Sequence, residues 1–514
     1  MKKKILTLLV LFSALLLEKA AFGAIIVGRI SHVEGQISRY MDAGQTWVET
    51  FAESPAGTQD VLATGNSSRA EIIFPNSIRV QLDENAEIEI LNLEEDTADF
   101  FLQTGLARFY NRSAALTIAV NTARGTAKAG PGSVIDMLVD GNVVVVAAVR
   151  GATTFQASAS GNVEVLSGSS VLEFHEDSIL TGIGPINRYW NSWCQGRENV
   201  WSRKRLVRSE YLPETMQEYA HVLEPHGNWH RIYYRGYYYW AWQPSNVAAG
   251  WAPYTTGYWY GWQGDSVWID HNPWGWVTHH HGHWLHMQGA WMWTPYVHVS
   301  HIPGVTVVGF NITFGREYRS YWHPGRVRWI AHSGHIGWLP LAPWETYYGH
   351  RRWGPRSMLV QGRSDLQINI NLADHKHIGH AVIIPKRYFR HQGRLVINNY
   401  NTVRIRNSNK TKIIKKYRPV AKTGEQHHRK HETRAARTQK RVASFDQKTR
   451  VEKITNQGKR GPQNINGARD DKPRPPDNSA SNKQREKKPR QVNVSAGSKT
   501  VTGQKNAAPA VQQN

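Results

Sequence analysis

The chain has 514 residues, a formal net charge of +23, 21 tryptophans and one cysteine. The single cysteine, Cys194, excludes an intramolecular disulfide framework. Charge is unevenly distributed: residues 24–181 hold nine basic and 20 acidic residues, residues 182–400 hold 21 and 11, and residues 401–514 hold 29 and eight. These breaks predict an acidic domain, a mildly basic domain and a strongly basic tail.

The N-terminus has the three parts of a secretory signal. Lysines at residues 2–4 precede an apolar run over residues 5–17, and residues 21–23 end the segment with small side chains at the positions that a signal peptidase reads. The alternative, a membrane anchor, needs about 20 apolar residues, and Glu18 interrupts the run before that length. We therefore predict a cleaved signal peptide over residues 1–23 and an exported protein of the periplasm or cell surface, with no transmembrane segment in the mature chain.

The acidic segment, residues 24–181, consists of short runs in which apolar and polar residues alternate between Gly, Asn and Asp. Residues 70–74 and 78–82 follow this pattern, and Asp140-Gly141 is typical of a tight hairpin turn. Alternation places one face of a strand on a core and the other face in water. The segment is predicted to be an all-β jelly-roll or solenoid-like domain in a mainly β chain.

Part of this segment resembles the FecR family. Residues 61–72 read VLATGNSSRAEI, residues 122–126 read TARGT and residues 149–151 read VRG. The resemblance implies an extracytoplasmic β-domain that binds a ligand or partner. In the best-known members such a domain signals to a sigma factor through a membrane helix, which the sequence of this chain does not predict.

A helical connector is predicted over residues 182–225. Aromatic and aliphatic residues such as Trp190, Trp193 and Trp201 recur at roughly helical spacing, and Pro213 interrupts the pattern. We expect two short helices whose aromatic stripe serves packing. Cys194 lies within this stripe and is expected to be a small buried side chain.

The next segment, residues 226–400, is predicted to be a repeat domain of short hairpins rich in tryptophan. Seventeen of the 21 tryptophans lie between Trp229 and Trp353, and two stretches recur with an offset of 25 residues. Gly250, Trp251, Gly257 and Trp259 in the first stretch correspond to Gly275, Trp276, Gly282 and Trp284 in the second. A fixed period indicates repeated supersecondary units.

Most of these rings are expected to form a core, because each one buries about 150–250 Å². A minority could instead face solvent and stack against the C–H faces of sugars. The candidate ligand-binding residues are Trp251, Tyr254, Trp259, Trp276 and Trp284, and cell-wall glycans are the candidate ligands.

The tryptophan-rich segment also resembles a domain of unknown function that commonly follows FecR-like domains in exported bacterial proteins. The resemblance rests on six motifs: YLPETM at 211–216, HGNW at 226–229, GWAPY at 250–254, PWGW at 273–276, GWLPLAP at 337–343 and AVIIPK at 381–386. It implies no catalytic residues.

The histidines invite a metal hypothesis. His279, His280 and His281 lie close to His283 and His286 in sequence, but adjacent residues of a strand point to opposite faces and few acidic residues are near to orient the rings. We predict a His-rich turn without a metal. The sequence also shows none of the common catalytic motifs. We predict a non-enzyme without a cofactor; an uncharacterised hydrolase would need two convergent carboxylates.

The tail, residues 401–514, is predicted to be disordered because it combines low hydrophobicity with high net charge. Its basic runs could hold nucleic acid, but export makes an anionic envelope surface the expected partner. The leading hypothesis is a non-enzymatic envelope protein that binds an envelope polymer or protein. The alternative is a FecR-type signalling module that acts through a separate membrane partner.

Overall fold

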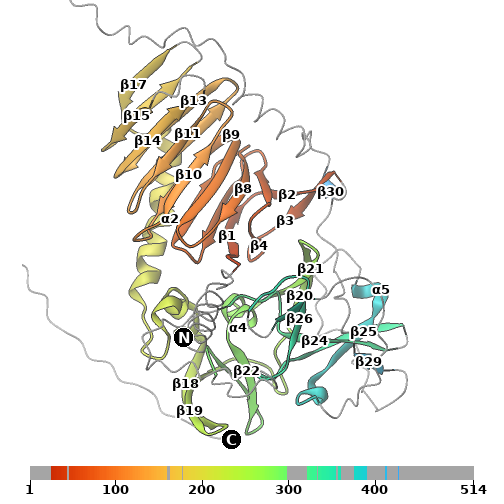
Figure 1. The fold of residues 1–514 in the computed structure, drawn as a ribbon. Helices are drawn as coiled ribbons and strands as arrows, with labels where there is room; N and C mark the ends of the chain where they lie inside the picture. Colours follow the sequence, from red (N-terminus) through yellow and green to blue (C-terminus); the bar gives the residue numbers. More distant parts are fainter. Residues whose placement is uncertain are drawn as a thin grey trace, which may run out of the picture. The chain divides into compact units, whose positions relative to one another are not determined.

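The computed structural model describes residues 25–42, 45–158, 163–175, 178–297, 321–332, 334–354, 357–359, 375–389, 411–413 and 426–427. These residues belong to one compact unit and are mainly β, as predicted (Figure 1). None of the helices in these ranges combines the length and the apolar character that crossing a bilayer requires. The predicted signal peptide, residues 1–23, lies outside the described residues.

The first domain consists of two layers of mostly antiparallel strands, which we call sheets A and B (Figure 1). Sheet A has the order β17 (Ile179–Ile183), β16 (Ser170–Phe174), β13 (Val143–Arg150), β12 (Val134–Asp140), β9 (Thr97–Asn111), β7 (Ile78–Leu82), β6 (Arg69–Phe74), β1 (Gly28–Glu34) and β4 (Pro55–Ala56). Sheet B has the order β15 (Val163–Ser167), β14 (Ala152–Ala157), β11 (Gly125–Ala129), β10 (Thr117–Asn121), β9, β8 (Glu87–Leu93), β5 (Val61–Thr64), β2 (Ile37–Met41), β3 (Thr46–Thr50) and β30 (Gln426–His427).

Strand β9 joins the two sheets because its first half pairs in sheet B and its second half in sheet A. The change occurs at Gly105, whose φ is +84°. A Cβ at this position would lie 2.4 Å from Cα of Ala86, so only glycine fits. The inner faces of both sheets form one apolar core that includes Ile72, Phe100 and Met137.

The outer face of sheet A does not face water, which corrects the expectation drawn from the alternating pattern. Its polar residues Glu71, Gln81 and Asp136 are fully buried. Helix α2 (Arg188–Leu206) covers part of this face: its Arg197 and Trp201 donate to Glu71, and its Asn191 accepts from Arg108, which pairs with Asp136. A strand pattern cannot distinguish a polar face in solvent from one covered by a distant helix.

The predicted helical connector is present, but its division differs from the expected two short helices. Helix α2 spans 19 residues, and Asn187 caps it by accepting the backbone N–H of Trp190 at 3.0 Å. A loop and Pro213 follow, and then come the short turns η2 (Glu214–Tyr219), α3 (Ala220–Leu223) and η3 (Glu224–His226). Cys194 is a residue of α2 and its side chain is buried, as predicted.

The tryptophan-rich domain is built from short hairpins (Figure 1). A four-stranded sheet has the order β18 (Gly227–Tyr234), β19 (Tyr237–Pro244), β23 (Ala290–Thr294) and β22 (His283–Met287). A second has the order β28 (Val382–Pro385), β25 (His335–Pro340), β24 (Val327–His332) and β29 (Thr411–Ile413). Two pairs complete the domain: antiparallel β20 (Gly257–Trp262) with β21 (Asp265–Asp270), and parallel β26 (Tyr347–Gly349) with β27 (Ser357–Leu359). The short helical segments are α4 (Gly275–His280), η6 (Ile378–His380) and α5 (Lys386–Phe389).

Four of these hairpins share a cross-strand pair of tryptophans. The pairs are Trp229 with Trp242, Trp259 with Trp268, Trp284 with Trp293, and Trp329 with Trp338. The second and third pairs are offset by 25 residues and follow the predicted spacing. The other half of the predicted repeat differs, because Trp276 lies in helix α4 and Trp251 lies outside helices and strands. The first and fourth pairs have the same cross-strand arrangement, although the 25-residue spacing did not predict them.

The expectation of a structureless basic tail falls mostly outside the described residues. Within residues 401–514 the structure describes two short strands. Strand β29 pairs with β24, and β30 pairs with β3 of the first domain.

Candidate functional site

The two domains meet at a buried junction. The indole Nε1 of Trp262 donates to Asp60 Oδ2 at 2.9 Å, and Arg39 Nε lies 3.5 Å from Asp60 Oδ1. Arg39 also donates to the Tyr260 hydroxyl at 3.4 Å. All four side chains are buried. Because the charged groups pair with each other and with ring donors, the β20–β21 hairpin and the first domain form one packed body.

A second part of the junction contains a carboxyl group with an unusual pKa. Arg29 binds both carboxylate oxygens of Glu53, at 2.9 and 3.0 Å, and its guanidinium lies 6.0 Å from the centre of the Trp276 ring. Nearby, burial raises the pKa of Glu218 to about 7, although the Arg29 charge and a hydrogen bond with Tyr219 oppose the rise. Glu218 therefore changes charge near neutral pH.

This shift predicts how stability depends on pH. Between pH about 4.5 and 7 the Glu218 carboxyl ionises in the unfolded chain but stays protonated in the folded one, so its contribution to stability falls as pH rises through that window. We expect Glu218→Gln to be more stable than the wild type at pH 8, with a difference that shrinks towards pH 4. Thermal unfolding of both proteins across this range measures it, and equal pH profiles would contradict the prediction.

The candidate rings predicted from the sequence lie mostly in the core. Tyr254, Trp259, Trp276 and Trp284 are each less than a tenth exposed, and Trp251 is half-buried against the Trp284 ring at 5.3 Å. The expectation that these five form an open stacking platform is therefore corrected. Their cross-strand and edge-to-face partners fill the space that a sugar would need.

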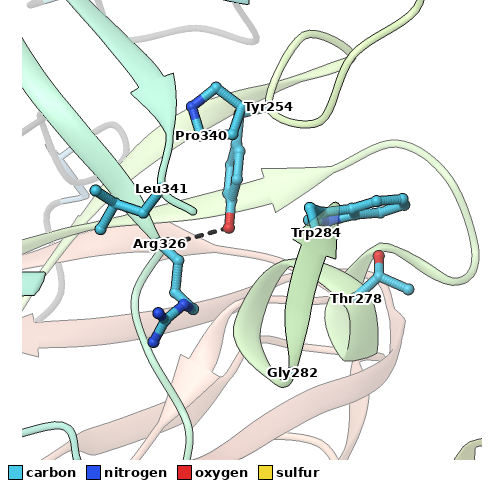
Figure 2. Close-up of a pocket in the computed structure, with 7 residues that line it drawn as sticks. All are labelled: Tyr254, Thr278, Gly282, Trp284, Arg326, Pro340 and Leu341. Atoms are coloured by element: carbon cyan, nitrogen blue, oxygen red, sulfur yellow. Dashed lines mark hydrogen bonds between the residues drawn. The ribbon is translucent and has the colours of Figure 1, made fainter. Parts of the chain in front are cut away.

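Tyr254 illustrates this structural role. Its hydroxyl accepts the backbone N–H of Arg326 at 2.9 Å and donates to the His279 carbonyl at 3.0 Å. Figure 2 shows it lining a pocket with Trp284 and Leu341. The pocket has roughly 200 Å³ of space between atoms but no interior room for a water molecule. It is a packing gap between hairpins and not a ligand site.

His279 and His280 end helix α4 and His281 follows it, not in a strand as the metal argument assumed, whereas His283 and His286 do lie in strand β22. His280 is buried, stacks on Trp322 at 4.9 Å, and its Nδ1 lies 2.7 Å from the His323 carbonyl. Burial lowers the pKa of His280 and of His281 to about 3, so both are neutral at pH 7. In the part of the chain that the structure describes, no group of three His, Cys, Asp or Glu residues is placed to hold a metal ion.

Within the described residues of this domain, the exposed tyrosine and tryptophan rings are on the β18–β19 hairpin, and the sequence argument did not select them. Tyr233 is 59% exposed, Tyr238 64% and Trp240 41%. These three rings project from one face, because Tyr233 pairs with Tyr238 and Arg231 with Trp240 across the hairpin. Tyr237, 45% exposed at the end of the hairpin, belongs to the other face. The opposite face, with Ile232 and Tyr239, packs on a small apolar cluster.

A signal for this face was present in the sequence. Residues 230–240 read HRIYYRGYYYW, and Arg235-Gly236 marks a two-residue turn. Both turn residues have positive φ, +49° and +91°, as a hairpin turn of this length requires. Counting strand positions outwards from the turn places Arg231, Tyr233, Tyr238 and Trp240 together.

Comparison with known families finds one match in the first domain and one that lies mostly in the tryptophan-rich domain. Residues 60–154 match the family model described as FecR protein, and residues 220–345 match a family of unknown function, DUF6600. A FecR-like domain precedes a domain of unknown function. The family resemblances drawn from the sequence motifs are thereby confirmed. No curated protein matches the chain.

Two solved structures resemble part of the chain. Both are described as crystal structures of "a putative anti-sigma factor" from Parabacteroides distasonis. The first is 14% identical and covers 26% of this chain and 65% of its own, with a TM-score of 0.24. The second is 13% identical and covers 28% and 72%, also with a TM-score of 0.24. This chain therefore spans slightly less than two thirds of the first structure.

Proposed function

We propose that this is an exported, non-enzymatic protein of the bacterial envelope whose two domains form a binding head for an envelope polymer. The observation that carries the proposal is the set of aromatic side chains exposed on the β18–β19 hairpin, because a monomeric protein rarely exposes contiguous apolar surface without a binding role. The secretory signal in the sequence and the FecR-like domain support the location.

The buried carboxylates support a non-catalytic role. Asp136 forms two hydrogen bonds with Arg108, at 2.6 and 2.7 Å, and Glu71 accepts from Arg197 at 2.8 Å. Asp265 accepts from the Trp353 indole at 3.1 Å. Each of these groups is occupied by a partner within the fold, which is typical of structural and not of catalytic carboxylates.

The basic tail adds contact with an anionic surface. Residues 428–514, which follow the last described strand, contain 21 basic and seven acidic residues. A segment with this charge is attracted to acidic polymers and phospholipid head groups at low ionic strength. We propose that the tail holds the head near the envelope while the aromatic surface binds the polymer.

Co-sedimentation with purified cell-wall material tests this function. The full chain and a variant lacking residues 428–514 are compared, so that strands β29 and β30 remain in both. We expect both proteins to sediment, the shorter one more weakly and with less dependence on salt. Failure of both to sediment would refute the proposed function.

The FecR match favours a second function, a signalling module that acts through a separate membrane partner. Crosslinking in intact cells distinguishes it, because a signalling module should yield one defined membrane protein. Recovery of wall polymer alone would favour the binding head.

A further inference from the structure

The exposed face of the β18–β19 hairpin, residues 230–240, has a composition that is unusual for solvent. We call it the aromatic face and define it by Arg231, Tyr233, Tyr238 and Trp240. The rings of Tyr233 and Tyr238 are 5.1 Å apart, and the Arg231 guanidinium lies 4.5 Å from the centre of the Tyr238 ring. Tyr211 from the connector extends the face, with its ring 4.5 Å from that of Trp240.

Comparison of two equivalent tryptophans shows that this face is left open. Trp240-Ala241-Trp242 in β19 corresponds to Trp291-Met292-Trp293 in β23, and Trp242 pairs directly with Trp293. Trp291 is only 4% exposed, because the rings of His377 and His380 cover it at 4.7 and 5.1 Å. Trp240 is 41% exposed. Among the described residues, one outer ring of the repeat is thus covered, and the other stays 41% exposed although Tyr211 contacts it.

The hairpin itself carries charge of one sign, whereas Glu210 forms a hydrogen bond with Tyr211 at the edge of the face. Residues 230–240 contain two arginines and no acidic residue. Arg231 is exposed, and its guanidinium lies over the Tyr238 ring at 4.5 Å. Arg235 is exposed at the turn, but its guanidinium lies over Trp344 at 4.2 Å, and Trp344 stacks on Tyr234 of the opposite face. A guanidinium held flat on a ring keeps its N–H edge available for a carboxylate.

We propose that the aromatic face binds an extended polysaccharide that carries carboxylate groups. This inference rests on the proposed envelope function and names its site and ligand chemistry. The rings of Tyr233, Tyr238 and Trp240 stack on the C–H faces of successive sugars, the tyrosine hydroxyls bond to sugar hydroxyls, and Arg231 pairs with a carboxylate.

The size of the face favours a polymer over a globular protein partner. Three rings and Tyr211, each of about 200 Å² and roughly half exposed, offer on the order of 400 Å². A stable protein interface buries about 800 Å² on each partner. The face is therefore too small to hold a folded protein, but it suits a few sugar units along the hairpin.

The hairpin is also rigid enough to present the rings in one arrangement. Its two-residue turn fixes the register, its other face packs on Leu285 and Met292, and the Tyr234 ring stacks on Trp344 at 6.3 Å. A surface ordered before binding loses little conformational entropy when the ligand arrives.

Affinity measurements with two matched polymers test the site on the full-length protein. Polygalacturonate carries free carboxylates, and its fully methyl-esterified form has the same backbone without charge. In high salt, which screens the tail, we expect Tyr238→Ala combined with Trp240→Ala to weaken binding to both polymers by about 100-fold, or about tenfold per ring. Arg231→Gln, tested at low salt in the variant lacking residues 428–514, should reduce only the preference for the charged polymer.

Tyr189→Ala is the matched control, since this ring is 86% exposed but lies on α2. It should bind both polymers like the wild type. If the double variant sediments with cell-wall material and binds polygalacturonate as tightly as the wild type, the site is wrong and the proposed function stands. If the wild type does not sediment at all, the proposed function fails and this inference fails with it.

Discussion

Glu71→Ala is expected to destabilise the first domain by about 3–5 kcal/mol and to release helix α2. The Glu71 carboxylate is fully buried and accepts hydrogen bonds from Arg197 at 2.8 Å and from the Trp201 indole at 2.6 Å, both on α2. Gln81 donates to its other oxygen at 2.7 Å. Although burial opposes ionisation, the hydrogen bond from Arg197 and the charge of Arg79 lower the pKa of Glu71. Removing the carboxylate leaves Arg197 without this counter-charge and leaves Arg79 paired with Glu198 alone among the described ion pairs.

The lone cysteine reports this release directly. Cys194 lies on the buried side of α2 and packs against Leu106. Burial raises the pKa of its thiol, so the thiol should resist thiol reagents in the wild type. We expect Glu71→Ala to increase its labelling rate at least tenfold alongside the loss of stability. Glu94→Ala, at an exposed position of the same domain, is the control. Unchanged labelling in Glu71→Ala would show that the network does not hold the helix.

The repeat architecture could be predicted from the sequence because it depends on local spacing. The 25-residue offset located the hairpins that contain Trp259 and Trp284, and the strand period placed each Trp-x-Trp motif on one face. The helical connector and the buried Cys194 followed from periodicity for the same reason.

The choice between core and surface rings could not be predicted, because distant segments decide it. Trp291 is covered by residues more than 80 positions later in the chain, whereas Trp240, in an equivalent motif, is not. Likewise, Glu71 has the alternating pattern of a solvent-facing residue, yet its partner Arg197 lies 126 residues away. Local patterns assign faces to strands, but they do not show what packs on each face.

Trp262→Ala is expected to separate the unfolding of the two domains. The ring is 2% exposed and packs on Trp322 at 5.7 Å and on Trp353 at 6.3 Å, and its indole N–H binds Asp60 in the first domain. Loss of a buried tryptophan costs about 3–5 kcal/mol through lost contacts and the cavity left behind. Asp60 also loses the hydrogen bond from the indole while Arg39 remains beside it, so the variant weakens the contact between the two domains.

Differential scanning calorimetry measures this coupling. The wild type should unfold with its two domains together, whereas Trp262→Ala should show two separate transitions, because the contacts that join the domains are weakened more than either core. Trp240→Ala is the matched control: it also removes an indole, but one that is 41% exposed and lies on the β18–β19 hairpin. A single transition at an unchanged temperature in Trp262→Ala would mean that the Asp60 contact does not couple the domains. Two transitions would show that the Trp262 indole, which binds Asp60 of the first domain, is needed for the two domains to unfold as one cooperative body.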